Sequence, residues 1–510
     1  MDIRYVHELK NEATLIGLSP SECALIAAAK ARNIPCSRID QSNLLYFGYG
    51  KKQKHSWGTL PADTGAIAYN IVDDRVLLPQ LLKAAGIPVA ISFLLENLEE
   101  AWSMAQELGV PVVIKRRYAS YAKGAHLNLQ SQAEVESAYS LTKEDEYSAI
   151  MEQFIQGNTY HLLIMHGQLV AASCEQDAGI VDVKTIVHSE NIRYAALAAK
   201  VVGLKIAHIV MVAEDIAHSL RMQGGKIIGI NPELNLLYWQ FIKSENPAAQ
   251  ALIADFFPEN NEEASRIPIF SVVGLRGQNL TARLLQHIFL QQKYDVGLAC
   301  QQGMLLNQRL INKHSSNHAK AAAQLLLNPW IDHAVLENSW QGIEKAGLGF
   351  ETCSYSLITD LATEHLPKDS LQREQVVKNM RCVMDALMNQ GVAILPAEDH
   401  FTETLVKAFR RKICYFATSS DNAVLQAHTK KGGSAVYLKN NLIILAQGQD
   451  KIAALSAEIL FKLTHIAQKS LLAAVSAAWL SGIHAEDIQQ ALNSFRDWFI
   501  PEAVEQGSHL

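Results

Sequence analysis

Apolar runs of five or six residues alternate along the chain with amphipathic segments of helical period, an arrangement typical of α/β proteins. One helix is predicted over 98–108, because Asn97 is a good N-cap before it and Gly109 a good stop after it. The strand predicted over 111–115 follows directly. A similar pattern predicts a helix over 73–87. The pattern therefore predicts strands alternating with helices.

The segment 267–290, IPIFSVVGLRGQNLTARLLQHIFL, predicts a buried strand, a glycine turn and an amphipathic helix, which is the architecture of a phosphate-binding loop. Gly274 and Gly277 would let the backbone N–H groups curl round a phosphate. A P-loop needs a Lys and a Ser or Thr after the second glycine, and this chain has Gln278 and Asn279. The loop is therefore predicted to be degenerate, or to be a plain strand-turn-helix corner that never bound nucleotide.

Composition limits the classes of protein to which this chain could belong. With 510 residues, of which 49% are hydrophobic and 19% charged, the chain is long enough for roughly two to four domains. The N-terminus lacks a signal sequence and no apolar run approaches the length of a membrane span, so we expect a cytoplasmic location without membrane contact. The net charge of −6 and the lack of long basic tracts argue against nucleic-acid binding. The seven cysteines form no CxxC and suggest neither disulfides nor zinc.

Many short blocks, in order along nearly the whole chain, resemble the cyanophycin synthetase family. They include LLYFGYGKKQKHSW, AIAYNIVDDRVLLPQLLKAAGIPV, EEAWSMAQELGVPVVIK, MEQFIQGNTYHLLIMHGQLVAAS and AVLENSWQGIEKAGLGFETC. That family makes a polymer with an aspartate backbone and arginine on each side chain. Its ATP-grasp domain adds aspartate and its Mur-ligase-like domain adds arginine.

The resemblance implies an α/β fold in two parts. An ATP-grasp-like domain is expected over 1–265, with the polar stretch 258–264 as linker. A Mur-ligase central-like domain with a mostly parallel sheet is expected over 266–510, with the degenerate P-loop at 274–280. We expect the C-terminal Mur domain and the polymer-binding N-terminal domain of the family to be absent.

In the ATP-grasp half, Lys115 matches the family's first phosphate-binding lysine and Glu152 its hinge carboxylate near the adenine. The glycine-rich flap of the family is replaced by Tyr118–Gly124, whose bulky side chains would crowd a phosphate. His161 stands where the family carries an arginine, so a fixed charge is replaced by one that titrates near neutrality.

Mg²⁺ prefers oxygen ligands, so its carboxylates are hard to replace. The family's aspartate and glutamate ligands are Val210 and Gly229 in this chain, and of that trio only Asn231 survives. In the Mur-like half, Glu337 matches the family's Mg²⁺ glutamate. Three other carboxylates are expected to be surface groups rather than ligands: Glu214, Asp215 and Glu233.

We therefore expect no intact catalytic residue and no bound cofactor. The vestigial positions are Lys115, Glu152, Gly274 and Gly277 for nucleotide, and Asn231 and Glu337 for metal. The favoured hypothesis is a homo-oligomeric pseudoenzyme that supports cyanophycin metabolism by binding the synthetase or cyanophycin itself. One alternative is an active ligase with an acyl-phosphate mechanism, which would use ATP and Mg²⁺. Another is an α/β binding module unconnected with cyanophycin.

Overall fold

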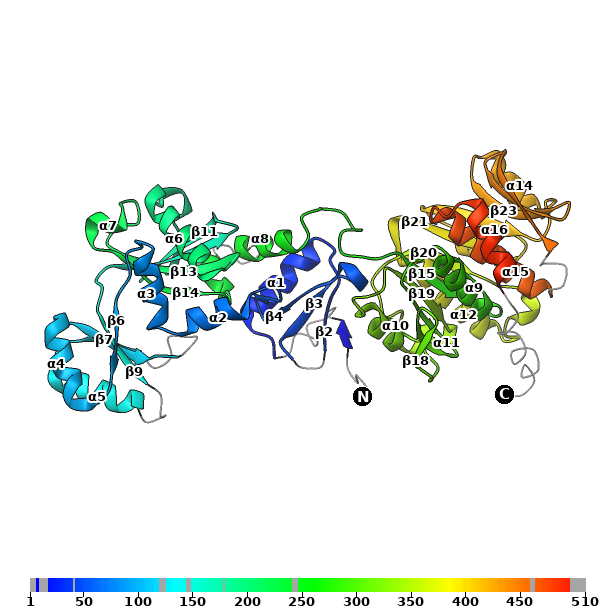
Figure 1. The fold of residues 1–510 in the computed structure, drawn as a ribbon. Coiled ribbons are helices and arrows are strands. Elements are labelled where there is room, and N and C mark those ends of the chain that lie inside the picture. The colour runs from blue at the N-terminus through cyan, green and yellow to red at the C-terminus, as the bar shows by residue number, and fades with distance from the viewer. Residues whose placement is uncertain are drawn as a thin grey trace. The chain divides into compact units, whose positions relative to one another are not determined.

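The structure is a computed structural model that describes residues 6–8, 17–39, 42–118, 125–143, 148–177, 179–240, 246–458 and 464–495 (Figure 1). The chain forms two compact units. The N unit consists of Leu9–Leu45 and Lys54–Asn260, and the C unit of Met1–Glu8, Tyr46–Gln53 and Asn261–Leu510.

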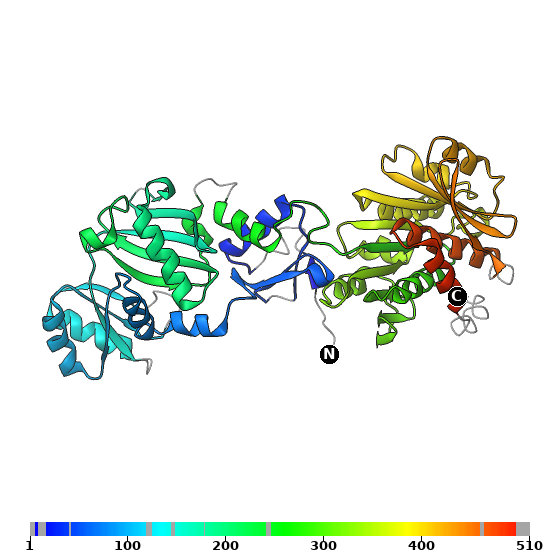
Figure 2. The ribbon, with the colours of Figure 1, turned by 45° about the horizontal axis from the view of Figure 1, so that its top comes forward.

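The large lobe of the N unit is a five-stranded antiparallel sheet covered by helices. Its strands, in spatial order, are β12 (Gly179–Asp182), β11 (Gln168–Gln176), β10 (Asn158–Met165), β13 (Ile206–Ala213) and β14 (Lys226–Asn231). Helix α6 (Ser189–Val202) lies across one face of this sheet, and α2 (Ala66–Asp73) and α3 (Leu77–Ala84) pack beside it (Figures 1 and 2). These elements enclose one hydrophobic core.

The small lobe of the N unit is a four-stranded antiparallel sheet with two helices packed against it. The strands, in spatial order, are β6 (Ser92–Leu95), β9 (Ala149–Gln153), β7 (Val112–Arg116) and β8 (His126–Leu129). Helices α4 (Leu98–Leu108) and α5 (Gln132–Lys143) contact each other and the sheet, and together they enclose a separate core.

Further elements of the N unit are α1 (Pro20–Ala31), the short strands β2 (Cys36–Ile39), β4 (Lys54–Trp57) and β5 (Leu60–Pro61), and α7 (Leu220–Gln223), the 3₁₀ helix η4 (Leu236–Trp239) and α8 (Pro247–Phe256). Strand β3 (Leu44–Phe47) begins in the N unit and ends in the C unit. Helix α1 has a full capping box at Ser19 and Glu22, which fixes the residue at which it begins.

The C unit is built on an eleven-stranded sheet whose seven central strands are parallel. These are β16 (Val296–Cys300), β19 (His333–Asn338), β15 (Ile269–Val273), β20 (Cys353–Ile358), β21 (Leu387–Pro396), β22 (Lys412–Ala417) and β23 (Ser434–Lys439). Antiparallel strands flank them: β17 (Gly303–Leu306) and β18 (Arg309–Asn312) at one edge, β24 (Leu442–Gln447) and β25 (Asp450–Ser456) at the other. The predicted mostly parallel sheet is confirmed.

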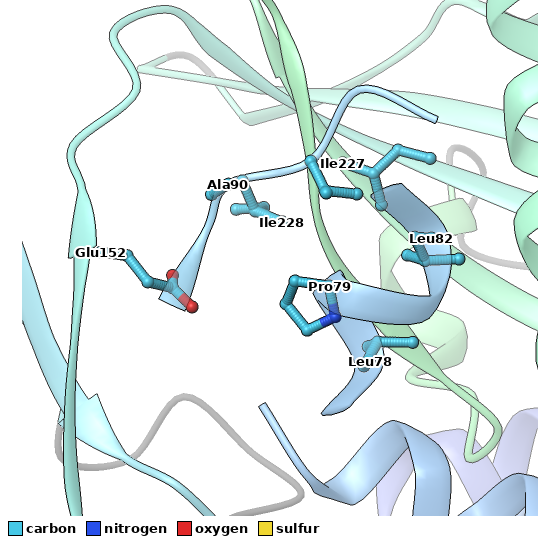
Figure 3. A pocket seen from close by; sticks show the side chains of 9 residues that line it. Leu78, Pro79, Leu82, Ala90, Glu152, Ile227 and Ile228 are labelled. Atoms are coloured by element: carbon cyan, nitrogen blue, oxygen red, sulfur yellow. The ribbon is translucent and has the colours of Figure 1, made fainter. Parts of the chain in front are cut away.

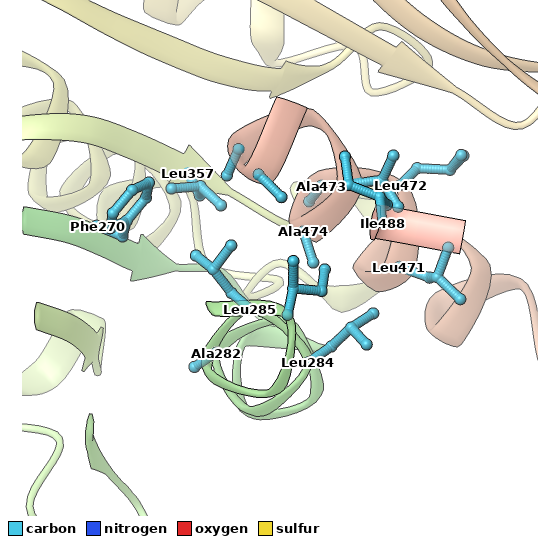
Figure 4. Close-up of a cluster of buried hydrophobic side chains, with 14 of the residues drawn as sticks. Phe270, Ala282, Leu284, Leu285, Leu357, Leu471, Leu472, Ala473, Ala474 and Ile488 are labelled. Atoms are coloured by element: carbon cyan, nitrogen blue, oxygen red, sulfur yellow. The ribbon is translucent and has the colours of Figure 1, made fainter. Parts of the chain in front are cut away.

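Helices cover both faces of this sheet, so its central strands are buried on both sides. One face packs against α9 (Gln278–Gln291), α15 (His465–Leu480) and α16 (Ala485–Ser494), with Phe270 and Leu285 in the shared core (Figure 4). The other face packs against α10 (Ala319–Leu326), α11 (Trp340–Ala346), α12 (Ser370–Asp385), α13 (Thr402–Val406) and α14 (Ala423–Lys430).

The helix predicted over 98–108 is confirmed residue for residue, and the one predicted over 73–87 forms only over Leu77–Ala84, as α3. Two helices, α2 and α3, meet at Asp74, whose backbone leaves the helical region at φ −85° and ψ 100°. The Asp74 carboxylate accepts hydrogen bonds from the N–H groups of Val76 and Leu77 and so starts α3 anew.

The compact units also divide the chain differently from the predicted domains 1–265 and 266–510, whose boundary stays a prediction. The units divide at Asn260, and Tyr46–Gln53 belongs to the C unit. The sequence pattern around Gly48 and Gly50 suggested a surface hairpin, whereas both glycines are buried. Their absent side chains explain this, because a Cβ at Gly50 would lie 2.6 Å from the carbonyl oxygen of Ile331.

Candidate functional site

Lys115 on β7 and Glu152 on β9 come together in the small lobe, and their expected nucleotide-binding roles stay a prediction. The Lys115 ammonium lies 2.5 Å from a Glu152 carboxylate oxygen, and Ser92 donates a hydrogen bond to the other oxygen. Both side chains are largely buried, and burial lowers the pKa of Lys115 in spite of the opposing effect of Glu152. The lysine charge is thus paired within the protein.

Arg75 is a third charged residue near this pair, and the sequence analysis missed it. It lies in the turn between α2 and α3, and its guanidinium donates a hydrogen bond to the carbonyl of Arg116 at 3.0 Å. Its charge acts on both Glu152 and Lys115, which places the three groups in one neighbourhood. The helix predicted over 73–87 included Arg75, whereas the residue lies in the turn between α2 and α3.

The expected metal positions share one face of the five-stranded sheet. Val210 lies opposite Gly229 and also opposite His161, and His208 lies opposite Asn231. Residues paired across antiparallel strands project to the same side, and so do alternate residues of one strand. This face therefore gathers two imidazoles and one amide, and a Glu175 carboxylate oxygen lies 3.2 Å from Nε2 of His161.

Aromatic side chains cover that face. Ring nitrogens of His161 and His208 lie 2.9 Å apart, Tyr238 stacks on His161 with ring centroids 3.7 Å apart, and the indole N–H of Trp239 donates to the carbonyl of His161 at 3.2 Å. Trp239 is fully buried. Burial and the neighbouring His161 lower the pKa of His208 to about 3, so its ring is neutral at physiological pH.

Mg²⁺ does not suit this set of side chains, because it demands oxygen ligands in near-octahedral geometry. Asn231 is the survivor of the expected trio, and its amide nitrogen lies 3.5 Å from His208. Glu233 lies beside Glu22, with carboxylate oxygens of both near Gly58. Throughout the described ranges, no group of three or more His, Cys, Asp or Glu side chains is arranged to hold a metal ion.

A small cavity lies between the two lobes of the N unit. This cavity of about 20 Å³, the size of one water molecule, separates Glu152 from α3 and β14 (Figure 3). Its lining consists of Leu78, Pro79, Leu82, Val89, Ala90, Glu152, Ile227, Ile228 and Gly229. Of the expected flap Tyr118–Gly124, only Tyr118 falls within the described residues, and it is exposed.

In the C unit the predicted strand-turn-helix forms as β15, the loop Gly274–Gly277 and α9. Gly277 is the N-cap of α9 with φ +80°, a conformation that favours glycine, and no side chain caps the helix. A Cβ at either glycine would collide with a neighbour, Thr359 at Gly274 and Ser470 at Gly277. Both glycines are therefore required by packing alone, and their assignment to a nucleotide site stays a prediction.

Glu337 and Asn279 meet beside this loop. The Asn279 amide nitrogen donates to a Glu337 carboxylate oxygen at 2.7 Å and also to the side-chain oxygen of Gln302, and the Gln301 N–H donates to the same Glu337 oxygen at 2.9 Å. Glu337 is buried, burial raises its pKa, and its second oxygen has no hydrogen-bond partner among the described residues. An amide N–H₂ group is a donor and not a metal ligand, so this arrangement does not suit Mg²⁺ either.

A buried ion pair behind the loop was not anticipated from sequence. The ammonium of Lys469 on α15 lies 2.5 Å from Asp399 and 4.0 Å from Asp360. His365 in turn lies 2.7 Å from the other Asp360 oxygen. Lysine in an apolar helix pattern gave no signal of this network, because its partners lie 70 or more residues away in the chain.

Two family models match the chain, in the order that the fold predicts. The ATP-grasp domain matches residues 80–230, and the Mur ligase middle domain matches residues 274–450. The protein is therefore an ATP-grasp domain followed by a Mur ligase middle domain, which confirms the fold class expected from the sequence.

Relatives over nearly the whole chain identify the family more closely. A cyanophycin synthetase from Crocosphaera subtropica is 26% identical over 97% of this chain and 66% of its own length, and one from Geminocystis herdmanii is 27% identical over 96% and 65%. This chain belongs to the cyanophycin synthetase family, as expected, and it spans about two thirds of the length of these relatives.

Similarity to solved structures is weaker. A bifunctional glutathione synthetase from Pasteurella multocida is 14% identical, with a TM-score of 0.36, over 47% of this chain and 43% of that one. In the part of the chain that the structure describes, no helix is long and apolar enough to cross a membrane.

Proposed function

We propose that this protein is a catalytically degenerate member of its ligase family that supports cyanophycin metabolism by binding the synthetase or its polymer. The family is one of ATP-dependent ligases, for which ATP and Mg²⁺ are the expected cofactors. In this proposal the chain keeps the binding surfaces of the family and has lost its catalytic activity.

The observation that carries the proposal is the covered face of the five-stranded sheet. At the two positions where the family carries metal-binding carboxylates, this sheet has Val210 and Gly229. On the same face, Tyr238 and Trp239 lie over His161 and His208. Removal of one group that stabilises the reacting phosphate costs roughly a thousandfold in rate. Losses at two metal positions should leave little activity.

The C unit supports the same proposal. Asn279 donates to Glu337 where a hydroxyl and a cation would be needed, and Gln278 supplies no charge to a phosphate. The cavity beside Glu152 in the N unit holds about 20 Å³, whereas pockets for drug-sized ligands measure roughly 300–1,000 Å³.

One observation favours the active ligase as a second candidate. Arg75, Lys115 and Glu152 converge in the N unit, and two cations beside a carboxylate are what phosphate binding next to a hinge would require. In that candidate, these residues and Asn231 form the active site and ATP with Mg²⁺ are its cofactors.

Calorimetry with ATP, with and without Mg²⁺, tests the two candidates on the full chain. The proposal expects no Mg²⁺-dependent binding and no phosphate release with aspartate, arginine, β-aspartyl-arginine or cyanophycin. The active-ligase candidate is supported if phosphate is released with any of these substrates and Lys115→Ala abolishes the release. Lys205→Ala, an exposed lysine paired with Asp63, is the matched control.

The binding half of the proposal needs a separate measurement. We expect self-association at micromolar concentration, and co-purification with an active cyanophycin synthetase or with cyanophycin granules. A chain that stays monomeric, binds neither and leaves the rate of the synthetase unchanged contradicts the proposal.

A further inference from the structure

The two lobes of the N unit are joined by more than the chain segments at Ile91 and Phe154. Arg117, which directly follows β7 in the small lobe, forms an ion pair with Asp74, which lies between α2 and α3 of the large lobe. Its Nε donates to one carboxylate oxygen at 3.1 Å and its Nη2 donates to the other at 2.7 Å. Such a bidentate pair is stronger and more directional than a single contact.

Both ends of this pair are fixed. On the large lobe, Asp74 also accepts from Val76 N–H at 2.9 Å and from Leu77 N–H at 3.2 Å, so its carboxylate cannot swing away without uncapping α3. On the small lobe, the Arg117 N–H donates to the carbonyl of Ser148 at 2.8 Å and ties β7 to the segment that leads into β9.

The main chain reinforces the contact. The Arg75 N–H donates to the carbonyl of Arg117 at 3.1 Å, the Arg75 guanidinium donates to the carbonyl of Arg116 at 3.0 Å, and Asp74 forms an antiparallel bridge with Tyr118. The turn between α2 and α3 in the large lobe thus pairs with the segment that directly follows β7 in the small lobe.

The lobes leave little space while this contact holds. The cavity between them admits a single water, and its walls come from α3 and β14 on one side and Glu152 on the other (Figure 3). Because Asp74 holds the first residues of α3 through the N–H groups of Val76 and Leu77, a movement of Arg117 away from Asp74 also moves β7 away from α3 and widens this cavity.

We propose that the Asp74–Arg117 pair is a latch that holds the small lobe closed on the large lobe, and that ligands larger than water reach the cleft only when it opens. Burial alone would raise the pKa of Asp74, but the hydrogen bonds from Arg117, Val76 and Leu77 lower it to about 2. The latch is therefore fully charged at neutral pH. The inference does not depend on whether the protein is catalytic.

Hydroxyl-radical footprinting of the full-length protein tests the latch, because it measures solvent access to individual side chains. The reporters are the cavity-lining Leu78, Pro79 and Ile227. In Asp74→Asn, the amide oxygen still caps α3 while the charge is lost, and we expect labelling of the reporters to rise roughly fivefold. Arg117→Gln should do the same, and the double variant should add nothing to either single change.

Arg117→Lys keeps the charge without the bidentate geometry and should give an intermediate rise. Asp63→Asn breaks an exposed ion pair with Lys205 in the same unit and should change nothing at the reporters. Unchanged labelling in both Asp74→Asn and Arg117→Gln overturns the proposal. Labelling that rises equally at Leu162, in the core of the large lobe, also overturns it, since that result means unfolding rather than opening.

Discussion

At the scale of single residues, two replacements in the expected sites, Asn279 and His161, have partners of their own. Asn279 is held by Glu337 and Gln302, and His161 by His208 and Tyr238. Reverting one position would therefore break the contacts of its neighbours as well as restore a family residue. The same contacts predict how these positions affect stability.

The buried Glu337 should make folding less favourable as the pH rises. Burial raises its pKa in the folded state, so the native protein binds more protons than the unfolded chain above the ordinary value of about 4.3. Wild-type stability should fall from that pH upward relative to Glu337→Gln, which does not titrate. Urea unfolding at several pH values measures this difference. Added Mg²⁺ that stabilises the wild type at neutral pH would contradict the absence of a metal role.

Trp239→Phe should destabilise the protein by about 1–3 kcal/mol, because it leaves the buried carbonyl of His161 without its donor. Trp57→Phe is the matched control, since Trp57 is 56% exposed and should change stability by less than about 0.5 kcal/mol. Both are measured by urea denaturation. Equal effects of the two substitutions would mean that Trp239 does not anchor the cover over the sheet.

At the scale of elements, the turn between α2 and α3 decides where the charged residues Asp74 and Arg75 lie. The apolar pattern continues across Asp74, so the sequence predicted one helix over 73–87. The carboxylate prefers to cap a new helix and to pair with Arg117, and these tertiary contacts outweigh local helix propensity. That break places Arg75 beside Lys115.

Asp74→Asn should cost about 1 kcal/mol at pH 7, after allowance for solvent screening of a partly exposed pair. The lowered pKa of Asp74 stabilises the fold above the unfolded value of about 3.9, and this contribution is lost as the pH falls towards 2. The difference in the free energy of unfolding between wild type and variant should therefore disappear over that pH range, as measured by urea titrations. A difference that is unchanged between pH 6 and pH 2.5 would show that the charge contributes nothing.

At the scale of the whole molecule, the segment Tyr46–Gln53 belongs to the C unit, although it lies in the N-terminal part of the chain. Tyr49 N–H donates to Ser265, Lys51 N–H to Ile331, and the Lys51 ammonium pairs with Asp332 at 3.0 Å. The C unit therefore includes residues that a division of the chain at 265 would leave out.

Gly50→Ala should destabilise the C unit by at least about 3 kcal/mol, because the methyl group meets Ile331 and Ile267 at a backbone φ of +58°. Gly482→Ala, at φ +95° with open space around it, should cost only about 1 kcal/mol. Calorimetric scans of both variants measure this. Similar losses in the two would mean that crowding at Gly50 is relieved by movement of the segment.

The sequence by itself determined the fold class, the family, the loop Gly274–Gly277 and the helix over 98–108, because periodicity, caps and turn glycines are local properties. It also brought forward Lys115, Glu152, Asn231 and Glu337 as candidates. Only the tertiary structure decided which groups face one another: Arg75 beside Lys115, Trp239 over His161, Lys469 against Asp399, and Arg117 on Asp74. These contacts join residues that are distant in the chain, and no local pattern records the partner that a buried polar group finds.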